Sequence, residues 1–179
     1  IAVPTNEMLR SWGTLAFNSE ERAQRDQQLA KLRAAICVSD GLKQSDASGV
    51  GLVAVRTILE GELLIDPTAL YTMRPPADLD PYWYIKLSPG YIILRDDEIR
   101  LRSMVSCVNE ANHRLDGRSM RSGTAKEGPN VRWQLDRPSG GGTPRLAFQA
   151  VAEIPKGTEL LADYRQSKLL ALSQADTTA

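Results

Sequence analysis

The feature that most constrains the fold of this chain is a succession of short apolar runs separated by residues that favour turns. Beyond residue 48 the runs are GLVAVRTI, ELLIDPTALYTM, YWYIKL, YIILR, NVRWQL and RLAFQAVAEI. Gly, Pro, Asp and Ser are frequent between them, and Glu60-Gly61 predicts a hairpin turn between the first two. No helical pattern alternates with these runs, so we expect a β-rich α+β protein rather than a sheet of βαβ units.

The clearly helical stretch lies near the start of the chain. Asn18 and Glu21, three residues apart, have the pattern of a capping box, which satisfies N–H groups at a helix start. Leu29, Leu32 and Ile36 then recur at helical spacing and form a narrow apolar stripe. Residues 1–35 are therefore predicted to be a helical segment that supports the main body, with a partner-binding helix as the alternative.

The charge balance bears on the class of partner. The 179 residues contain 22 Lys and Arg against 22 Asp and Glu, for a formal net charge of +0. A protein that binds nucleic acid usually has a basic excess, so we expect no direct nucleic-acid binding. No run approaches the roughly 18 apolar residues of a membrane span, and the start lacks the layout of a secretory signal. The expectation is a soluble intracellular domain.

The metal-ligand inventory is small. Cys37, Cys107 and His113 are the cysteines and the histidine of the chain, too few for a tetrahedral zinc site. We therefore expect no metal. Two cysteines this far apart suit either one disulfide or two buried thiols, and the sequence leaves both open.

Three short motifs stand in a fixed order along the β-rich part. The first is GVGLVA, residues 49–54, which opens a strand; the second is VNEA, residues 108–111, which follows an apolar run. The third, IPKGTELLADY, ends at Tyr164. Together they resemble the SET domain of protein lysine methyltransferases, whose members open with G-x-G and an x-G-E hairpin, continue with N-H-S-C-x-P-N and end with G-E-E-L-x-x-D-Y.

The resemblance covers roughly residues 36–165, and its middle motif departs from the family pattern. Asn112-His113 matches the letters N-H, whereas Asn109 directly follows an apolar strand but has Glu110 in place of the histidine. We favour Asn109, because the strand context outweighs the letters. Pro129-Asn130 is then the delayed P-N end of the motif, after a polar, Gly-rich insertion at residues 112–128.

The resemblance implies a SET-type β-clip fold of several short sheets with a C-terminal pseudoknot, in addition to the N-terminal helix. In that fold the Asn motif and the Asp-Tyr motif lie side by side. The implied domain spans residues 36–166, and residues 167–179 form a tail.

The resemblance also implies an S-adenosylmethionine-dependent protein-lysine methyltransferase. Its substrate would be a lysine-containing protein or peptide such as a histone tail, and its place the nucleus, with chromatin-complex partners. Tyr164 would be the catalytic tyrosine beside the methyl group and the cofactor, and either Tyr84 or Tyr91 would complete the lysine channel. The implied cofactor-binding residues are Gly49, Gly51, Leu52, Asn109, Glu110 and Tyr164.

A second functional class stays open. The residues after Tyr164, RQSKLLALSQADTTA, contain no cysteine and no aromatic residue, so they do not match the zinc-binding module that follows this motif in many relatives. The middle motif has also lost its histidine. The alternative is a catalytically inactive SET domain that serves as a chromatin-complex scaffold or peptide-binding module.

Overall fold

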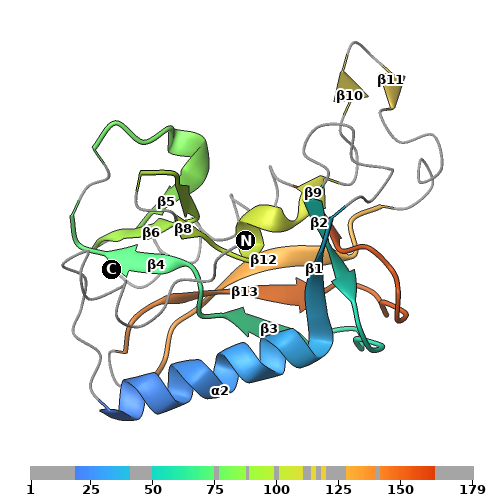
Figure 1. Ribbon diagram of the computed structural model, residues 1–179, viewed down its shortest axis with the longest axis horizontal. Helices are drawn as coiled ribbons and strands as arrows, with labels where there is room; N and C mark the ends of the chain where they lie inside the picture. Colours follow the sequence, from blue (N-terminus) through green and yellow to red (C-terminus); the bar gives the residue numbers. More distant parts are fainter. Residues whose placement is uncertain are drawn as a thin grey trace.

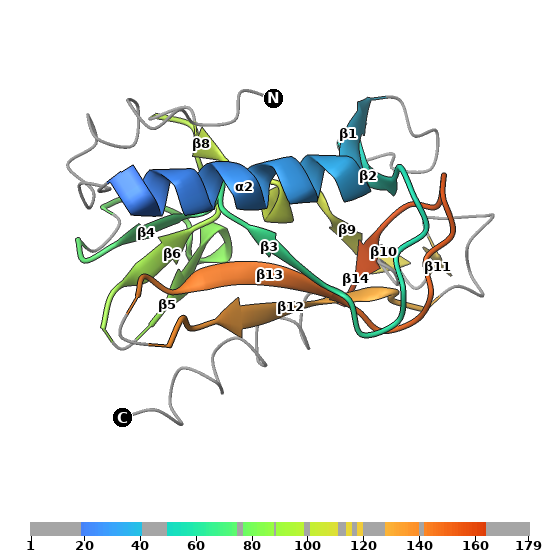
Figure 2. The same cartoon turned by 90° about the horizontal axis from the view of Figure 1, so that it is seen from below.

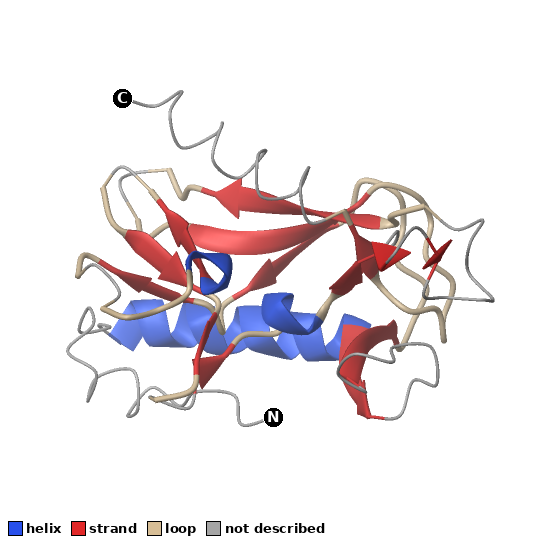
Figure 3. Cartoon of the chain, turned by 90° about the horizontal axis from the view of Figure 1, so that it is seen from above, coloured by secondary structure: helices blue, strands red, loops and turns tan. Residues whose placement is uncertain are grey.

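The computed structural model describes residues 19–40, 50–74, 77–87, 89–98, 101–110, 114–115, 118–119, 128–139 and 142–163. In that part of the chain several small β-sheets surround a shared core, and one long helix runs along the outside (Figure 1). Figure 3, coloured by secondary structure, shows the helix covering one side of the strands. The β-rich α+β architecture expected from the short apolar runs is confirmed.

Helix α2 (Ser19–Ala35) follows the predicted capping position, which itself lies outside the described residues. Glu20 and Glu21 occupy its first turn and Arg33 its last, an arrangement that complements the helix dipole. Leu32 and Ala35 are fully buried against the body. Ile36, predicted to continue the apolar stripe, is also buried, but it begins strand β1, because the chain leaves the helix after Ala35.

The largest sheet has five strands in the order β3-β13-β12-β14-β9. β13 pairs antiparallel with both β3 and β12, whereas β14 pairs parallel with β12 on one side and β9 on the other. The C-terminal motif is therefore in the interior of the sheet, at the side-by-side position that the pseudoknot predicts. The strands are β3 (Leu63–Asp66), β9 (Asn109–Glu110), β12 (Val131–Asp136), β13 (Arg145–Ala150) and β14 (Leu161–Ala162).

The other sheets are smaller and antiparallel. The order β4-β6-β5 makes a three-stranded sheet, and β1-β2, β7-β8 and β10-β11 make pairs. Two short 3-10 helices, η1 and η2, precede β5 and β9. The elements are β1 (Ile36–Asp40), β2 (Val50–Ala54), β4 (Leu70–Thr72), η1 (Pro81–Trp83), β5 (Tyr84–Lys86), β6 (Tyr91–Ile93), β7 (Arg95–Asp96), β8 (Leu101–Arg102), η2 (Val105–Cys107), β10 (Arg114–Leu115) and β11 (Arg118–Ser119).

The main core lies between the five-stranded sheet, α2 and β2. Alternate residues of β12, namely Val131, Trp133 and Leu135, are buried, as the period of two predicts. Phe148 of β13 is completely buried beside them. A second, smaller cluster of Leu70, Ile93 and Leu101 lies under the β4-β6-β5 sheet.

Two expectations need correction. Gly61 does form a turn, with φ of 79°, and Glu62 N–H donates to the Leu59 carbonyl at 3.0 Å. The runs on either side are not a hairpin, however, because β2 pairs with β1 and β3 pairs with β13. Cys37 and Cys107 are both free, and only Cys107 is buried, so the disulfide is wrong and the buried-thiol alternative holds for one of the two.

Two absences complete the description. Within the described ranges, no helix combines the length and apolarity needed to cross a bilayer. Among the same residues, no group of His, Cys, Asp and Glu side chains is arranged to hold a metal ion.

Candidate functional site

The three sequence motifs meet through backbone hydrogen bonds. β2, which contains Gly51 and Leu52, lies against the segment that leads into β14: Leu160 N–H donates to the Leu52 carbonyl at 2.8 Å, and Ala54 N–H donates to the Thr158 carbonyl at 2.9 Å. The same C-terminal segment then continues into β14, and there Leu161 pairs with Asn109 of β9. Segments about 50 residues apart in the sequence are thus neighbours, as Figure 2 shows for β2, β9 and β14.

Asn109 and Glu159 form a polar pair at this meeting point. The Asn109 side-chain amide donates to Glu159 Oε1 at 2.8 Å, and both residues are half-buried. Glu159 also forms a bridge with Val53 of β2, so it contacts both flanking motifs. The sequence analysis quoted Glu159 within its motif without giving it a role. The available signal was the second acidic letter of the family's G-E-E-L pattern.

Asn130 holds β14 in place. Its Oδ1 accepts the Leu161 N–H at 2.8 Å, and its Nδ2 donates to the Glu159 carbonyl at 2.9 Å. Its backbone N–H also donates to the Leu161 carbonyl at 2.9 Å. The side chain therefore satisfies two backbone groups of the strand that lies beside Asn109. This position agrees with the prediction that Pro129-Asn130 ends the Asn motif.

Cys107 and Trp133 belong to the core. Trp133 is 4% exposed and packs in the main cluster. Burial raises the pKa of the Cys107 thiol, which disfavours a reactive thiolate next to Asn109. Neither residue offers chemistry to the site.

Tyr84 and Tyr91 lie elsewhere. They occupy neighbouring strands, β5 and β6, and their rings meet edge to face with centroids 6.0 Å apart. Figures 1 and 2 place the β4-β6-β5 sheet and strand β9 at different positions along the long axis of the molecule. The two tyrosines thus contact each other, and the assignment of Tyr84 or Tyr91 to the lysine channel stays a prediction.

Several predicted site residues cannot be placed. Gly49, Tyr164 and the alternative register at Asn112-His113 lie outside the described residues. For Glu110 the structure describes the backbone, which pairs with Ala162. Gly51, Leu52 and Asn109 are the predicted cofactor-binding residues whose burial the structure describes.

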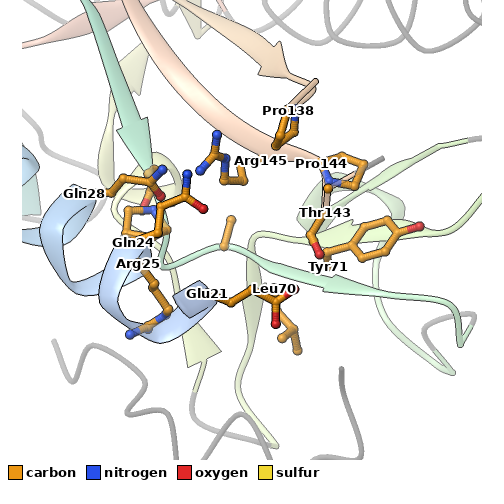
Figure 4. Close-up of a pocket in the computed structure, with 14 residues that line it drawn as sticks. Glu21, Gln24, Arg25, Gln28, Leu70, Tyr71, Pro138, Thr143, Pro144 and Arg145 are labelled. Carbon is orange, nitrogen blue, oxygen red and sulfur yellow. The ribbon is translucent and has the colours of Figure 1, made fainter. Parts of the chain in front are cut away.

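A cavity of about 120 Å³ lies away from these motifs, between the first turns of α2, the β3–β4 turn and the β12–β13 loop. Figure 4 shows Gln24 and Gln28 of α2 on one wall, with Thr143 and Pro144 across the opening. None of the predicted site residues lines it. We therefore locate the candidate site by the hydrogen-bonded meeting of β2, β9 and β14, and not by this cavity.

Comparison with known proteins gives a fold and no sequence family. No protein-family model matches the chain, and no curated protein matches it. Among solved structures, ATXR5 in complex with mono-methylated histone H3.1 matches with a TM-score of 0.50 and 18% identity over 83% of this chain and 67% of that one. The chain has a SET-type fold.

Two further solved structures match with lower TM-scores. A putative histone methyltransferase of Plasmodium falciparum has a TM-score of 0.45 and 13% identity, covering 73% of this chain and 92% of that one. Polycomb repressive complex 2 of Chaetomium thermophilum has a TM-score of 0.44 and 20% identity, covering 73% of this chain. This chain spans only 15% of the length of that matched chain.

Proposed function

We propose that this chain binds S-adenosylmethionine and transfers its methyl group to a lysine of a protein substrate such as a histone tail. The observation that supports the proposal is that hydrogen bonds join the segments of Gly51-Leu52, Asn109 and Glu159 to one another. The SET-type fold and the structural match to ATXR5, a protein seen with histone H3.1, support the substrate class. A nuclear location and chromatin-complex partners belong to the same proposal.

The polar groups at the meeting point suit the cofactor. S-adenosylmethionine has a zwitterionic amino-acid end, and Asn109 and Glu159 together offer an amide and a carboxylate. Gly51 has no Cβ to obstruct a ligand that approaches the strand backbone. We assign the amino-acid end to Asn109, the backbone contacts to Gly49, Gly51 and Leu52, and the adenine side to Glu110.

The chemistry at lysine requires a neutral amine. When bound, S-adenosylmethionine supplies a methyl group on a sulfonium: an N–C bond to lysine forms as the S–C bond breaks, the sulfur keeps the electron pair, and the amine releases its proton to water. Lysine has a reference pKa of about 10.4, so most of it is protonated at neutral pH. An apolar channel next to a positive charge lowers that pKa, and no carboxylate base is needed. Tyr164 is assigned the role of orienting the amine for in-line attack, with Tyr84 or Tyr91 as the second channel tyrosine.

A specific observation favours a second candidate, an inactive SET domain that serves as a scaffold or peptide-binding module. The Asn109 amide is already engaged by Glu159, and Tyr84 and Tyr91 pack against each other in a separate sheet. A domain that had lost catalysis would keep such internal contacts for stability. Cofactor binding separates the two candidates.

The test is calorimetric titration of the chain and of two variants with S-adenosylmethionine and S-adenosylhomocysteine. Asn109→Ala should raise the Kd about tenfold or more, because it removes a polar contact worth about 1.4 kcal/mol or more. Gln27→Ala, which truncates an exposed amide on α2, should leave the Kd unchanged. Wild-type chain with bound cofactor should then methylate a histone H3 peptide, and a peptide with every lysine changed to arginine should stay unmodified. Absence of binding at millimolar cofactor would support the scaffold candidate.

A further inference from the structure

A buried carboxylate lies at the end of strand β3, on the opposite edge of the five-stranded sheet from the strand of Asn109. Asp66, the last residue of β3, is 1% exposed. Its Oδ1 accepts the Thr68 N–H at 2.8 Å and the Thr68 hydroxyl, and its Oδ2 accepts the Val105 N–H at 2.8 Å. A buried charge is costly unless hydrogen bonds replace its water, so this set of donors makes the burial of Asp66 tolerable.

The turn from Asp66 to Thr68 accepts two hydrogen bonds from the start of η2. Val105 is the first residue of η2, and Met104 precedes it. The Met104 N–H donates to Thr68 Oγ1 at 2.8 Å, while the Val105 N–H goes to Asp66. The leading N–H groups of a helix have no partner within the helix, so these two side chains supply what η2 itself cannot. These two hydrogen bonds join residues that are separated by 36 and by 39 positions in the sequence.

η2 leads directly to Asn109. The Cys107 N–H donates to the Met104 carbonyl at 2.9 Å, and Val108 closes the short helix by donating to Val105. Val105 and Val108 are completely buried in the main core. Asn109 is the next residue and begins β9. The connection from Val105 to Asn109 is therefore short and packed into the core.

Helix α2 contributes the balancing charge. Arg25, on the body-facing side of α2, is only 7% exposed and interacts electrostatically with Asp66. Burial raises the pKa of Asp66, while the hydrogen bonds from Thr68 and Val105 and the charge of Arg25 act to lower it. Burial likewise lowers the pKa of Arg25, and the charges of Asp26 and Asp66 oppose that effect. Burial is the larger effect at both groups, so the pKa of Asp66 is raised and that of Arg25 is lowered, and the charge of each group opposes part of the shift of the other.

We propose that Asp66 is a positioning residue for Asn109: its carboxylate, balanced by Arg25 of α2, fixes η2 and thereby sets where β9 presents the Asn109 amide. The inference rests on the proposed function, since the amide is presented to the cofactor. It also gives the N-terminal helix, which the resemblance leaves unexplained, a part in the site.

The test compares two destabilising variants. Asp66→Asn keeps the shape of the side chain but turns one acceptor into a donor that faces other donors. Leu135→Ala removes buried volume from the far end of β12 without touching η2 contacts described above. Unfolding by denaturant gives the stability of each variant, and titration with S-adenosylhomocysteine well below the unfolding temperature gives its Kd. Asp66→Asn should raise the Kd about tenfold, whereas Leu135→Ala should leave it within about twofold.

Two further measurements separate positioning from simple stability. Arg25→Met should raise the Kd, as Asp66→Asn does. Arg25→Lys keeps the positive charge, so its Kd should lie between those of the wild-type chain and Arg25→Met. In nuclear magnetic resonance spectra, Asp66→Asn should move the Asn109 side-chain amide signals and speed exchange of the Val105 N–H, and Leu135→Ala should do neither. Wild-type Kd and unmoved Asn109 signals in folded Asp66→Asn would overturn the inference. If the wild-type chain binds no cofactor, the proposed function fails, and the spectra alone decide the positioning role.

Discussion

Gly90 shows how a single residue can constrain the small sheet. Its φ is +92°, and a Cβ placed there would lie 2.7 Å from Tyr71 Oη and 2.8 Å from the ring. Tyr71 in turn donates its hydroxyl to the Pro89 carbonyl at 3.1 Å. Gly90→Ala should therefore lose about 2–3 kcal/mol in the free energy of unfolding, about 1 from the backbone and the rest from displacing the ring.

Gly61→Ala is the matched control for that prediction. Gly61 has a similar φ of +79°, but no atom lies within 4 Å of the added Cβ. Only the backbone cost of about 1 kcal/mol should appear. Denaturant unfolding of both variants measures the difference, and equal losses would show that the Tyr71 contact has no energetic consequence.

At the residue scale, the sequence indicates the neighbourhood of Asn109 but contains no signal for the role proposed for Asp66. Asn109 was chosen over Asn112 because it follows an apolar strand, and the structure places it opposite Leu161 in the motif's partner strand. Asp66 gave no such signal, because an Asp before Pro-Thr has the composition of an ordinary turn. Its role depends on burial and on a partner 39 residues away, which no local pattern contains.

Strand β14 is the element on which the site depends most. It has only two residues, and the side chain of Asn130 satisfies groups on both sides of Leu161. Asn130→Ala should lose about 1–3 kcal/mol of stability, because the Leu161 N–H and the Glu159 carbonyl lose their side-chain partner. Hydrogen exchange should speed up at Leu161 in Asn130→Ala and less in Asn130→Asp, whose carboxylate still accepts that N–H. Unchanged protection in the alanine variant would show that backbone pairing alone holds β14.

Local elements were predictable, and their long-range pairing was not. Strands β12 and β13 are consecutive in the chain, and the apolar residues Val131, Trp133 and Leu135 alternate along β12 in the same way as its buried positions. The turn at Gly61 was also predicted, but β2 and β3 pair with β1 and β13, since many strands can satisfy the same apolar pattern. The family resemblance implied that the Asn motif and the Asp-Tyr motif lie side by side, whereas the parallel pairing of β14 with β9 and β12 is seen only in the structure.

On the scale of the whole molecule, the candidate site joins three parts of the chain that separate on unfolding. β2, β9 and β14 contribute residues around positions 51, 109 and 159. A ligand that contacts all three binds the native chain and not the unfolded one, so binding must raise the free energy of unfolding. At about 100 times the Kd the increase is about 2.7 kcal/mol, which for a chain of this size raises Tm by about 5–10 °C.

The corresponding measurement is calorimetric scanning with increasing S-adenosylhomocysteine, on the wild-type chain and on Asn109→Ala. The wild-type Tm should rise with ligand concentration, and the variant should need about ten times more ligand for the same rise. An equal rise in both would place the ligand away from Asn109. The cavity between α2 and the β12–β13 loop would then be the first place to look, and Gln28→Ala on its wall should reduce the rise. The two variants thus assign any stabilisation to one end of the molecule or the other.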